Sequence, residues 1–184
     1  MKFTKYHALG NDYLVYSGAD EFCLSKDEVV RICDRRYGVG ADGILFLERL
    51  DNEKVVVRIL NSDGSEAEKS GNGLRILSKY LWDIGFVSKK PFQLHTQGGV
   101  VSSKVLDQGR CVEVSMGKAN FSSSNIGMST YKDQVINYPV EVLDQVLNIN
   151  AVSMGNPHCV VFVDEISQKI TKRLGPILEK IHFF

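Results

Sequence analysis

The chain has 184 residues, 43% of them hydrophobic, which is enough for one large or two small domains with a buried core. Lysine plus arginine and aspartate plus glutamate number 22 each, so no overall field draws the protein to nucleic acid or to an anionic membrane. No stretch approaches the roughly 18 apolar residues of a membrane span, and the N-terminus has no apolar signal region, so we expect a cytosolic protein.

Short runs of β-branched and aromatic residues, separated by Gly, Asn and Asp, predict strands in the first third of the chain. They are residues 2–7, 13–16, 44–47 and 55–60. A helix is expected between the second and third strands, because Ser25 and Glu28 form a capping box in which each side chain can satisfy the other's backbone N–H. The apolar side of this helix comprises Val29, Val30, Ile32 and Cys33.

A second helix is predicted to follow Ser70 and to end at Gly85, a residue suited to the left-handed conformation that closes helices. Its apolar residues are spread around most of the circumference and are Leu74, Ile76, Leu77, Tyr80, Leu81, Trp82 and Ile84. A helix with so little polar face has to be enclosed by other structure. We expect that enclosure from the earlier strands together with strands at 92–95, 100–106 and 111–115, the last two joined by a hairpin turn at 107–110.

The second part of the chain is predicted to form another domain. Residues 118–137 are polar, include three consecutive serines, and suit a linker. Beyond them we expect strands at 146–152 and 159–163, then helices at 167–173 and 176–181. The predicted domains are therefore residues 1–117 and 118–184. Because the chain stops at two aromatic residues that a terminus would leave exposed, the sequence suggests a truncated protein.

The cysteines do not indicate a metal or redox site. Cys23, Cys33, Cys111 and Cys159 show no Cys-x-x-Cys spacing, and no paired histidines stand at ligand spacing. Cys159 begins an apolar run and is best interpreted as a buried strand residue. We expect all four to be reduced residues of the core.

The glycine-rich segment 61–75 carries the clearest functional signal, since it leads from a strand through a polar turn into a helix. Backbone N–H groups at a helix N-terminus lack intrahelical partners, and Gly71-Asn72-Gly73 would let an anion approach them closely. The segment therefore predicts a cradle for a substrate carboxylate. Ser70 stands at its mouth, where it could either react with the bound ligand or simply cap the helix.

Four motifs in order give the chain its resemblance to a known family. They are the segments 7–13 (HALGNDY), 35–43 (RRYGVGADG), 61–75 (NSDGSEAEKSGNGLR) and 153–158 (SMGNPH). On these motifs the chain resembles the diaminopimelate epimerase family. The resemblance covers the whole chain and about the first two thirds of a typical member.

The resemblance implies an α+β fold in which strands roll around a central helix, in two similar domains of which the second is incomplete here. It also implies a cofactor-independent amino-acid epimerase, most like the enzyme that converts LL- to meso-diaminopimelate for lysine and cell-wall precursor synthesis. Neither pyridoxal phosphate nor a metal is expected. The implied partner is a small amino acid, without nucleic acid or membrane, and a homodimer or self-association through the unfinished domain is left open.

The site residues are carried over by position. Ser70 occupies the slot of the family's first acid/base residue, while His158 and Gly73 support the site. The implied substrate-binding residues are Asn11, Asn61, Gly71, Asn72 and Asn156. An asparagine suits such a role because it offers both a donor and an acceptor, although Asn11 and Asn61 also suit ordinary turns.

Three departures from the family pattern limit the functional inference. Family members have cysteine at position 70, a second cysteine in a Cys-Gly-(Ser/Thr)-Gly turn that these 184 residues do not contain, and often Gln at position 43 where this chain has Gly43. A serine hydroxyl is a far weaker acid than a thiol. Three hypotheses remain open: an impaired epimerase or related isomerase, an amino-acid-binding pseudoenzyme, and a truncated product that acts only through association.

Overall fold

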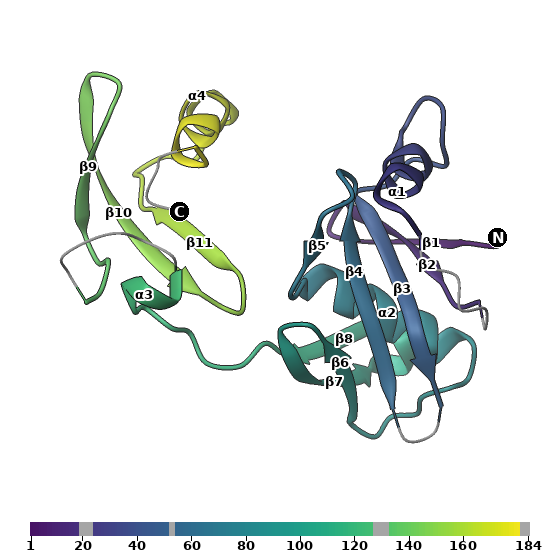
Figure 1. The fold of residues 1–184 in the computed structure, drawn as a ribbon. Coiled ribbons are helices and arrows are strands. Elements are labelled where there is room, and N and C mark those ends of the chain that lie inside the picture. The colour runs from purple at the N-terminus through teal and green to yellow at the C-terminus, as the bar shows by residue number, and fades with distance from the viewer. Residues whose placement is uncertain (19–23, 52–53, 127–132, 181–184) are drawn as a thin grey trace. The chain divides into compact units, whose positions relative to one another are not determined.

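A curled sheet wraps around helix α2 (Gly71–Asp83) in the first of two structural units, Met1–Met116 and Gly117–Phe184 (Figure 1). The computed structural model describes residues 1–18, 24–51, 54–126 and 133–180. The other elements of the first unit are β1 (Thr4–Ala8), β2 (Asn11–Tyr16), α1 (Lys26–Cys33), β3 (Gly43–Leu50), β4 (Val55–Asn61), β5 (Glu66–Ala67), β6 (Phe92–Thr96), β7 (Gly99–Leu106), the 3₁₀ turn η1 (Asp107–Gly109) and β8 (Cys111–Ser115).

The sheet is mixed, with strand order β1-β2-β3-β4-β6-β7-β8 and β5 paired to β4. Strand β2 runs parallel to β3, and β4 runs parallel to β6, while the other neighbours are antiparallel. Because β3 is antiparallel to β4, the strands β2 and β3 begin at the place where β4 ends. We call this border of the sheet, formed by the ends of the three strands, the sheet edge. This edge carries the polar residues of the candidate site.

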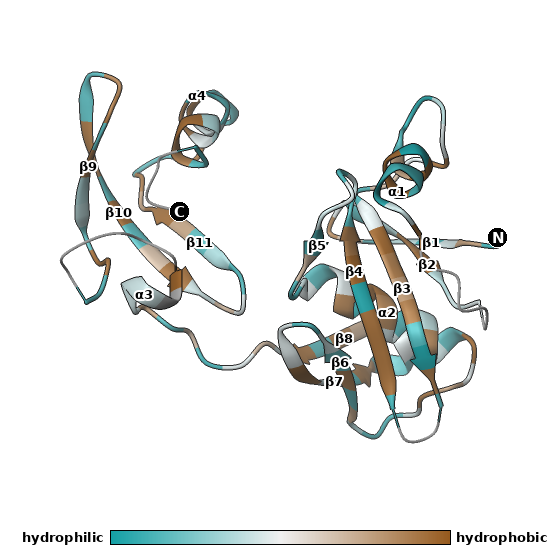
Figure 2. Cartoon of the chain, viewed as in Figure 1, coloured by the Kyte–Doolittle hydropathy of each residue, from teal (hydrophilic) through white to brown (hydrophobic). Residues whose placement is uncertain are grey.

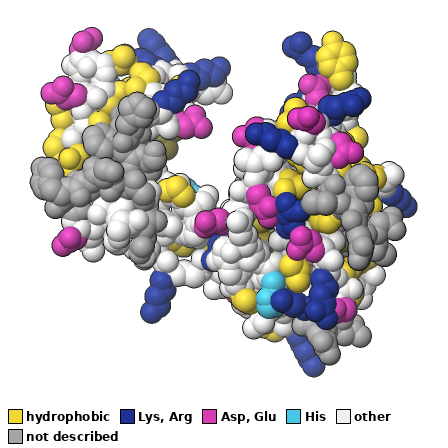
Figure 3. Space-filling view, in the orientation of Figure 1, with side chains coloured by type: hydrophobic (Ala, Val, Ile, Leu, Met, Phe, Trp, Pro, Cys, Tyr) yellow, Lys and Arg dark blue, Asp and Glu magenta, His cyan; other side chains and the backbone are white. Residues whose placement is uncertain are grey.

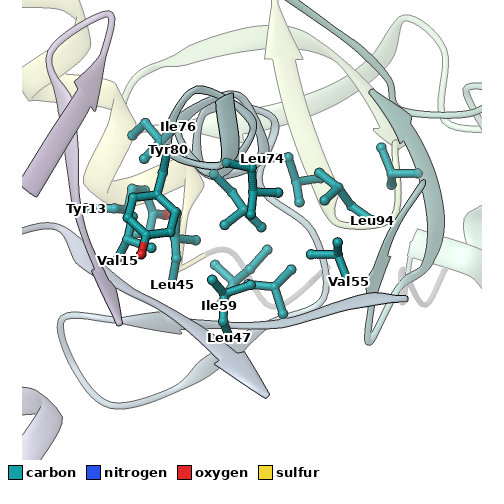
Figure 4. Close-up of a cluster of buried hydrophobic side chains, with 14 residues drawn as sticks. Tyr13, Val15, Leu45, Leu47, Val55, Ile59, Leu74, Ile76, Tyr80 and Leu94 are labelled. Carbon is teal, nitrogen blue, oxygen red and sulfur yellow. The ribbon is translucent and has the colours of Figure 1, made fainter. Parts of the chain in front are cut away.

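Strands β3 and β4 are apolar along most of their length because both of their faces are covered (Figure 2). Successive side chains alternate between the faces, so Leu45 points toward α2 whereas Ile44 and Phe46 pack with Val29 of α1. Figure 4 shows Leu74 of α2 above the apolar side chains of the sheet. The core around α2 comprises Tyr13, Val15, Leu45, Leu47, Val55, Val57, Ile59, Leu74, Ile76, Leu77, Tyr80, Leu81, Leu94 and Val101.

The predicted enclosure of α2 is confirmed, since only Asp83 among its residues is exposed. Its predicted end is confirmed as well: Gly85 has φ +73° and donates its N–H to the carbonyl of Trp82. The capping box of α1 is also present, with Ser25 Oγ accepting from the Glu28 N–H. The expectation that Val30 belongs to the apolar side of α1 is wrong, because Val30 is 42% exposed, and Val29 and Cys33 are the buried residues of this helix.

The second unit contains β9 (Tyr138–Val142), β10 (Gln145–Ser153) and β11 (Pro157–Val161), with α3 (Ser123–Ile126) and α4 (Gln168–Leu178). The strands form an antiparallel sheet in the order β11-β10-β9. Its core comprises Ile126, Val135, Val140, Val142, Ile149, Ala151 and Leu174. Strand β9 escaped prediction because it contains Pro139, which an edge strand tolerates.

Two expectations for this unit are corrected. The polar segment after residue 117 is not a plain linker: Asn120 exchanges two backbone hydrogen bonds with Ser153, and Val135 is fully buried. Polar composition misleads there because the end of β10 satisfies the backbone groups of this segment. The two helices expected at 167–173 and 176–181 are one helix, α4, which continues through Pro176. The preceding Gly175 has no Cβ to clash with the proline ring.

The surface carries both signs of charge interspersed, as the visible side of the first unit shows (Figure 3). None of the helices in the described ranges is both long and apolar enough to cross a membrane. Within the same ranges, no three His, Cys, Asp or Glu side chains are grouped so that they could hold a metal ion.

Candidate active site

Within the described ranges, the first turn of α2 presents two backbone donors without an acceptor. Ser70 is extended, at φ −141° and ψ 114°, and its Oγ accepts a hydrogen bond of 3.0 Å from the Gly73 N–H. The Leu74 N–H is bonded to the Ser70 carbonyl. Among the described residues, no acceptor is bonded to the N–H groups of Gly71 or Asn72. These two groups stand at the positive end of the helix dipole and can receive an anion.

Tyr13 connects this turn to the sheet. Its ring is buried, at 5% exposure, and its hydroxyl lies 3.5 Å from Ser70 Oγ. Two donors therefore surround the serine oxygen, the Gly73 N–H and the Tyr13 hydroxyl. Because the Ser70 oxygen accepts both of these hydrogen bonds, its own proton points away from them. The Ser70 hydroxyl is therefore oriented to donate a hydrogen bond to a ligand rather than to accept one.

Asn11 and Asn61 lie along the sheet edge where β2 and β3 begin and β4 ends. Tyr13 is paired with Gly43, which is paired in turn with Asn61. The loop before β3 is tied to both sides, since Asp42 donates its N–H to the Asp12 carbonyl and accepts the Ser62 N–H on its own carbonyl, at 2.9 and 3.0 Å. The fold thus brings together residues that are distant in the sequence.

The turn that carries Asn11 is held by an ionic network. Arg35 binds both Asp12 oxygens, at 2.7 and 3.1 Å, and its Nη2 also lies 2.7 Å from Asp42 Oδ1. Lys5 lies 2.9 Å from Asp12. The Arg35 hydrogen bonds hold the pKa of the Asp12 carboxyl well below its usual range, and the same bonds raise the pKa of Arg35. The network fixes the turn from β1 to β2 against the loop before β3.

Gly43 is a packing requirement in this backbone. A Cβ at this position would lie 2.3 Å from the Leu60 carbonyl oxygen and 2.7 Å from the Tyr13 ring. The space beside Gly43 is filled by β4 and by Tyr13, so in this chain no longer side chain fits without movement of the backbone.

Asn156 and His158 belong to the second unit, at the turn between β10 and β11. The Met154 N–H donates to the Asn156 carbonyl, and Gly155 has φ +102°. His158 Nδ1 lies 2.9 Å from the same Asn156 carbonyl. This short-range bond orients the imidazole and agrees with a supporting role for the histidine. The catalytic and binding roles of these residues stay predictions.

Sequence reasoning overlooked three contributors, Tyr13, Asp42 and Arg75. Arg75 stands three residues after Asn72 on the same helix and donates to its side-chain oxygen. The three-residue spacing on a predicted helix could have indicated this contact from the sequence. Tyr13 and Asp42 both lie within recognised motifs, but only the pairing of β2 with β3 places them at the site.

Known proteins are similar to this chain over nearly its whole length. The model of the diaminopimelate epimerase family matches residues 3–122. The chain belongs to this family. It is 46% identical to diaminopimelate epimerase 2 of Nostoc sp. over 187 residues, which cover 100% of this chain and 65% of that protein. It is 38% identical to the diaminopimelate epimerase of Synechocystis sp., over 97% of this chain and 66% of the relative. The chain thus spans slightly less than two thirds of the length of these relatives.

Among solved structures, a hydroxyproline epimerase from Agrobacterium vitis has a TM-score of 0.65, at 14% identity, over 94% of this chain and 52% of that chain. At such low identity the likeness concerns the fold alone. The predicted α+β fold, with strands rolled around a central helix, is confirmed. More distant proteins share this fold.

Proposed function

We propose that the chain forms the carboxylate-binding part of a cofactor-independent amino-acid epimerase acting on diaminopimelate, a precursor in lysine biosynthesis. The single observation that carries this proposal is that the N–H groups of Gly71 and Asn72 at the start of α2 have no bonded acceptor among the described residues. Epimerisation removes the α-proton and leaves a carbanion beside the carboxylate. Fixed backbone donors at that carboxylate stabilise the charge as it develops.

Ser70 is the proposed reacting group on one face of the α-carbon. With its oxygen surrounded by the Gly73 N–H and the Tyr13 hydroxyl, it is suited to donate a proton and poorly suited to accept one. Inversion also needs a group on the opposite face, and these 184 residues contain no cysteine turn of the family's second type. We therefore expect amino-acid binding with little or no inversion by this polypeptide.

A second candidate is an amino-acid-binding protein without catalysis, or an isomerase for another amino acid. The serine at position 70 favours it, because a hydroxyl has to be deprotonated by a neighbouring base before it can abstract a proton. This candidate uses the same cradle, so binding experiments do not separate it from the first. Exchange of the substrate α-proton by the variant Ser70→Cys does, because a site arranged for epimerisation holds the α-carbon beside the restored thiol and a binding protein without catalysis does not.

Replacement of Gly71 by proline tests the cradle directly. Proline is favoured at the first position of a helix and lacks the N–H, and the extended conformation of Ser70 is the one that a following proline requires. There is room, because a Cβ at Gly71 would meet only Arg75 and Met116, at 3.7 and 3.8 Å. Gly71→Pro thus removes one donor and keeps the helix.

Diaminopimelate binding to the 184-residue chain is measured by amide NMR titration. We expect shifts at Gly71 and Asn72, an affinity roughly 10-fold lower or worse in Gly71→Pro, and nearly parental affinity in the matched control Gly71→Ala, which keeps the N–H. Equal affinities in both variants, or shifts confined to remote residues, would refute the proposed carboxylate site.

A further inference from the structure

The two ends of an asparagine amide differ in chemistry but hardly in shape: the nitrogen only donates and the oxygen only accepts. The partner on one side therefore decides which end faces the other side. In the candidate site this rule orients three half-buried asparagines.

Asn11 faces an acceptor. Its side chain lies 2.8 Å from Asp42 Oδ2, which also accepts the Asp12 N–H at 3.0 Å, while Asp42 Oδ1 is bonded to Arg35. A carboxylate has no proton to offer, so the amide nitrogen of Asn11 has to be the end that faces it. The oxygen of Asn11 is turned away from Asp42 as an acceptor.

Asn61 is oriented in the same sense through a relay. The Ser65 hydroxyl donates to Asp63 Oδ1 at 2.6 Å, which uses its only proton. Ser65 Oγ therefore accepts from the Asn61 amide nitrogen, at 2.9 Å. The oxygen of Asn61 is left as the acceptor, on the same sheet edge as Asn11.

Asn72 is oriented in the opposite sense. Its oxygen accepts from Nη2 of Arg75, and a guanidinium can only donate. The amide nitrogen of Asn72 is left as a donor, in the same helical turn as the free N–H groups of Gly71 and Asn72. This turn therefore offers donors only.

We propose that Asp42 and Arg75 are positioning residues that set the amides of Asn11 and Asn72 in opposite orientations, so that the site recognises a zwitterion. Acceptors on the sheet edge receive the ammonium group of an amino acid, and donors at the start of α2 receive its carboxylate. The inference rests on the proposed function and adds to it a requirement for the ammonium group, set by a residue that does not touch the ligand.

The test is Asp42→Asn. Arg35 is a charged donor and would keep the oxygen of the new amide. The new nitrogen would then face the Asp12 N–H, which loses this acceptor, and Asn11, which has to flip and offer a donor where it offered an acceptor. Affinities are measured for diaminopimelate and for pimelate, the same dicarboxylate without amino groups. We expect the preference for diaminopimelate to fall about 10-fold, with pimelate binding unchanged. Adding Asn11→Asp to this variant should restore the preference, because a carboxylate accepts on both sides.

Asp107→Asn, in an exposed ion pair with Arg110, serves as the control and should leave the preference unchanged. If Asp42→Asn weakens both ligands equally, or the double variant fails to recover the preference, Asp42 has only a structural role and the proposal is wrong. A ligand-free measurement separates this outcome from failure of the proposed function. Because Asp42 Oδ2 accepts from both Asn11 and Asp12, a nuclear Overhauser effect should connect the Asn11 side-chain amide protons to the Asp12 N–H.

Absence of that effect in the parent protein overturns the assigned orientation, whatever binds. Its presence in the parent and loss in Asp42→Asn support the orientation even if neither ligand binds, a result that would refute the proposed function alone.

Discussion

The Ser70 hydroxyl oxygen accepts a hydrogen bond of 3.0 Å from the Gly73 N–H, so the residue at the family's cysteine position is also the cap of helix α2. The two roles that the sequence left open for Ser70 are thus compatible. The cap directs the oxygen toward the helix and leaves the proton for a ligand. Stability and chemistry at this position can therefore be tested separately.

Ser70→Ala should destabilise the first unit by about 1 kcal/mol, because alanine leaves the Gly73 N–H without a partner. The single tryptophan, Trp82, lies in α2, so its fluorescence during urea unfolding reports on this unit. Ser167→Ala removes the equivalent cap of α4 in the second unit and should leave the Trp82 transition unchanged. Equal effects of the two variants would contradict the assignment.

Leu77→Asp should destabilise the first unit by at least about 3 kcal/mol, since it places an unpaired charge where the side chain has 0% exposure. Ile84→Asp, just beyond the same helix at 49% exposure, should cost far less. Thermal melting followed by Trp82 compares the two. A Leu77→Asp protein that melts within a degree or two of the parent would show that α2 is not enclosed.

Acid should weaken the network around Asp12. Its folded pKa is lowered, chiefly by hydrogen bonds from Arg35, so the stabilisation is fully present above the unfolded pKa of about 3.9 and is lost as the pH falls below that value. In Arg35→Gln the urea midpoint should therefore fall less steeply between about pH 5 and pH 3. Arg110→Gln, which removes an exposed ion pair, should retain the parental slope.

Thiol reactivity should separate Cys33 from Cys111. Burial raises the pKa of the Cys33 thiol to about 11, and the thiolate is the reactive form, so Cys33 should resist iodoacetamide near neutral pH. Cys111 is exposed on β8 and should be alkylated first. Peptide mass spectrometry after timed labelling measures both, with labelling in urea as the control. Cys23 lies outside the described residues. Rapid labelling of Cys33 in the folded protein would contradict its burial.

The 184-residue chain should bind diaminopimelate without inverting it at a useful rate. Loss of one acid/base group costs about 10²–10⁴-fold, and this chain offers one hydroxyl at most. Ser70→Cys restores a thiol on one face, so it should exchange the α-proton in D₂O and still fail to invert. Proton exchange by NMR and chiral analysis of the product are measured together. Robust inversion by the parent chain would refute the mechanism and direct attention to His7, His95 and His158.

Signals that act over a few residues predicted local structure well. The capping box of Ser25 and Glu28, the cap at Ser70 and the left-handed Gly85 are all where the sequence indicates. Prediction failed where a distant partner decided the outcome. The segment containing Asn120 looked like a linker, but its backbone pairs with Ser153.

The sequence by itself determined the family, the glycine-rich entry to α2 and the apolar pattern that makes this helix central, because each depends on residue types in one continuous segment. Only the tertiary structure decided how the polar groups face one another. Tyr13 and Ser70 are separated by 57 residues, and Asn11 and Asp42 by 31, and the parallel pairing of β2 with β3 brings the second pair together. The orientation of an amide depends on the donor or acceptor opposite it, and that neighbour exists only once the sheet has formed.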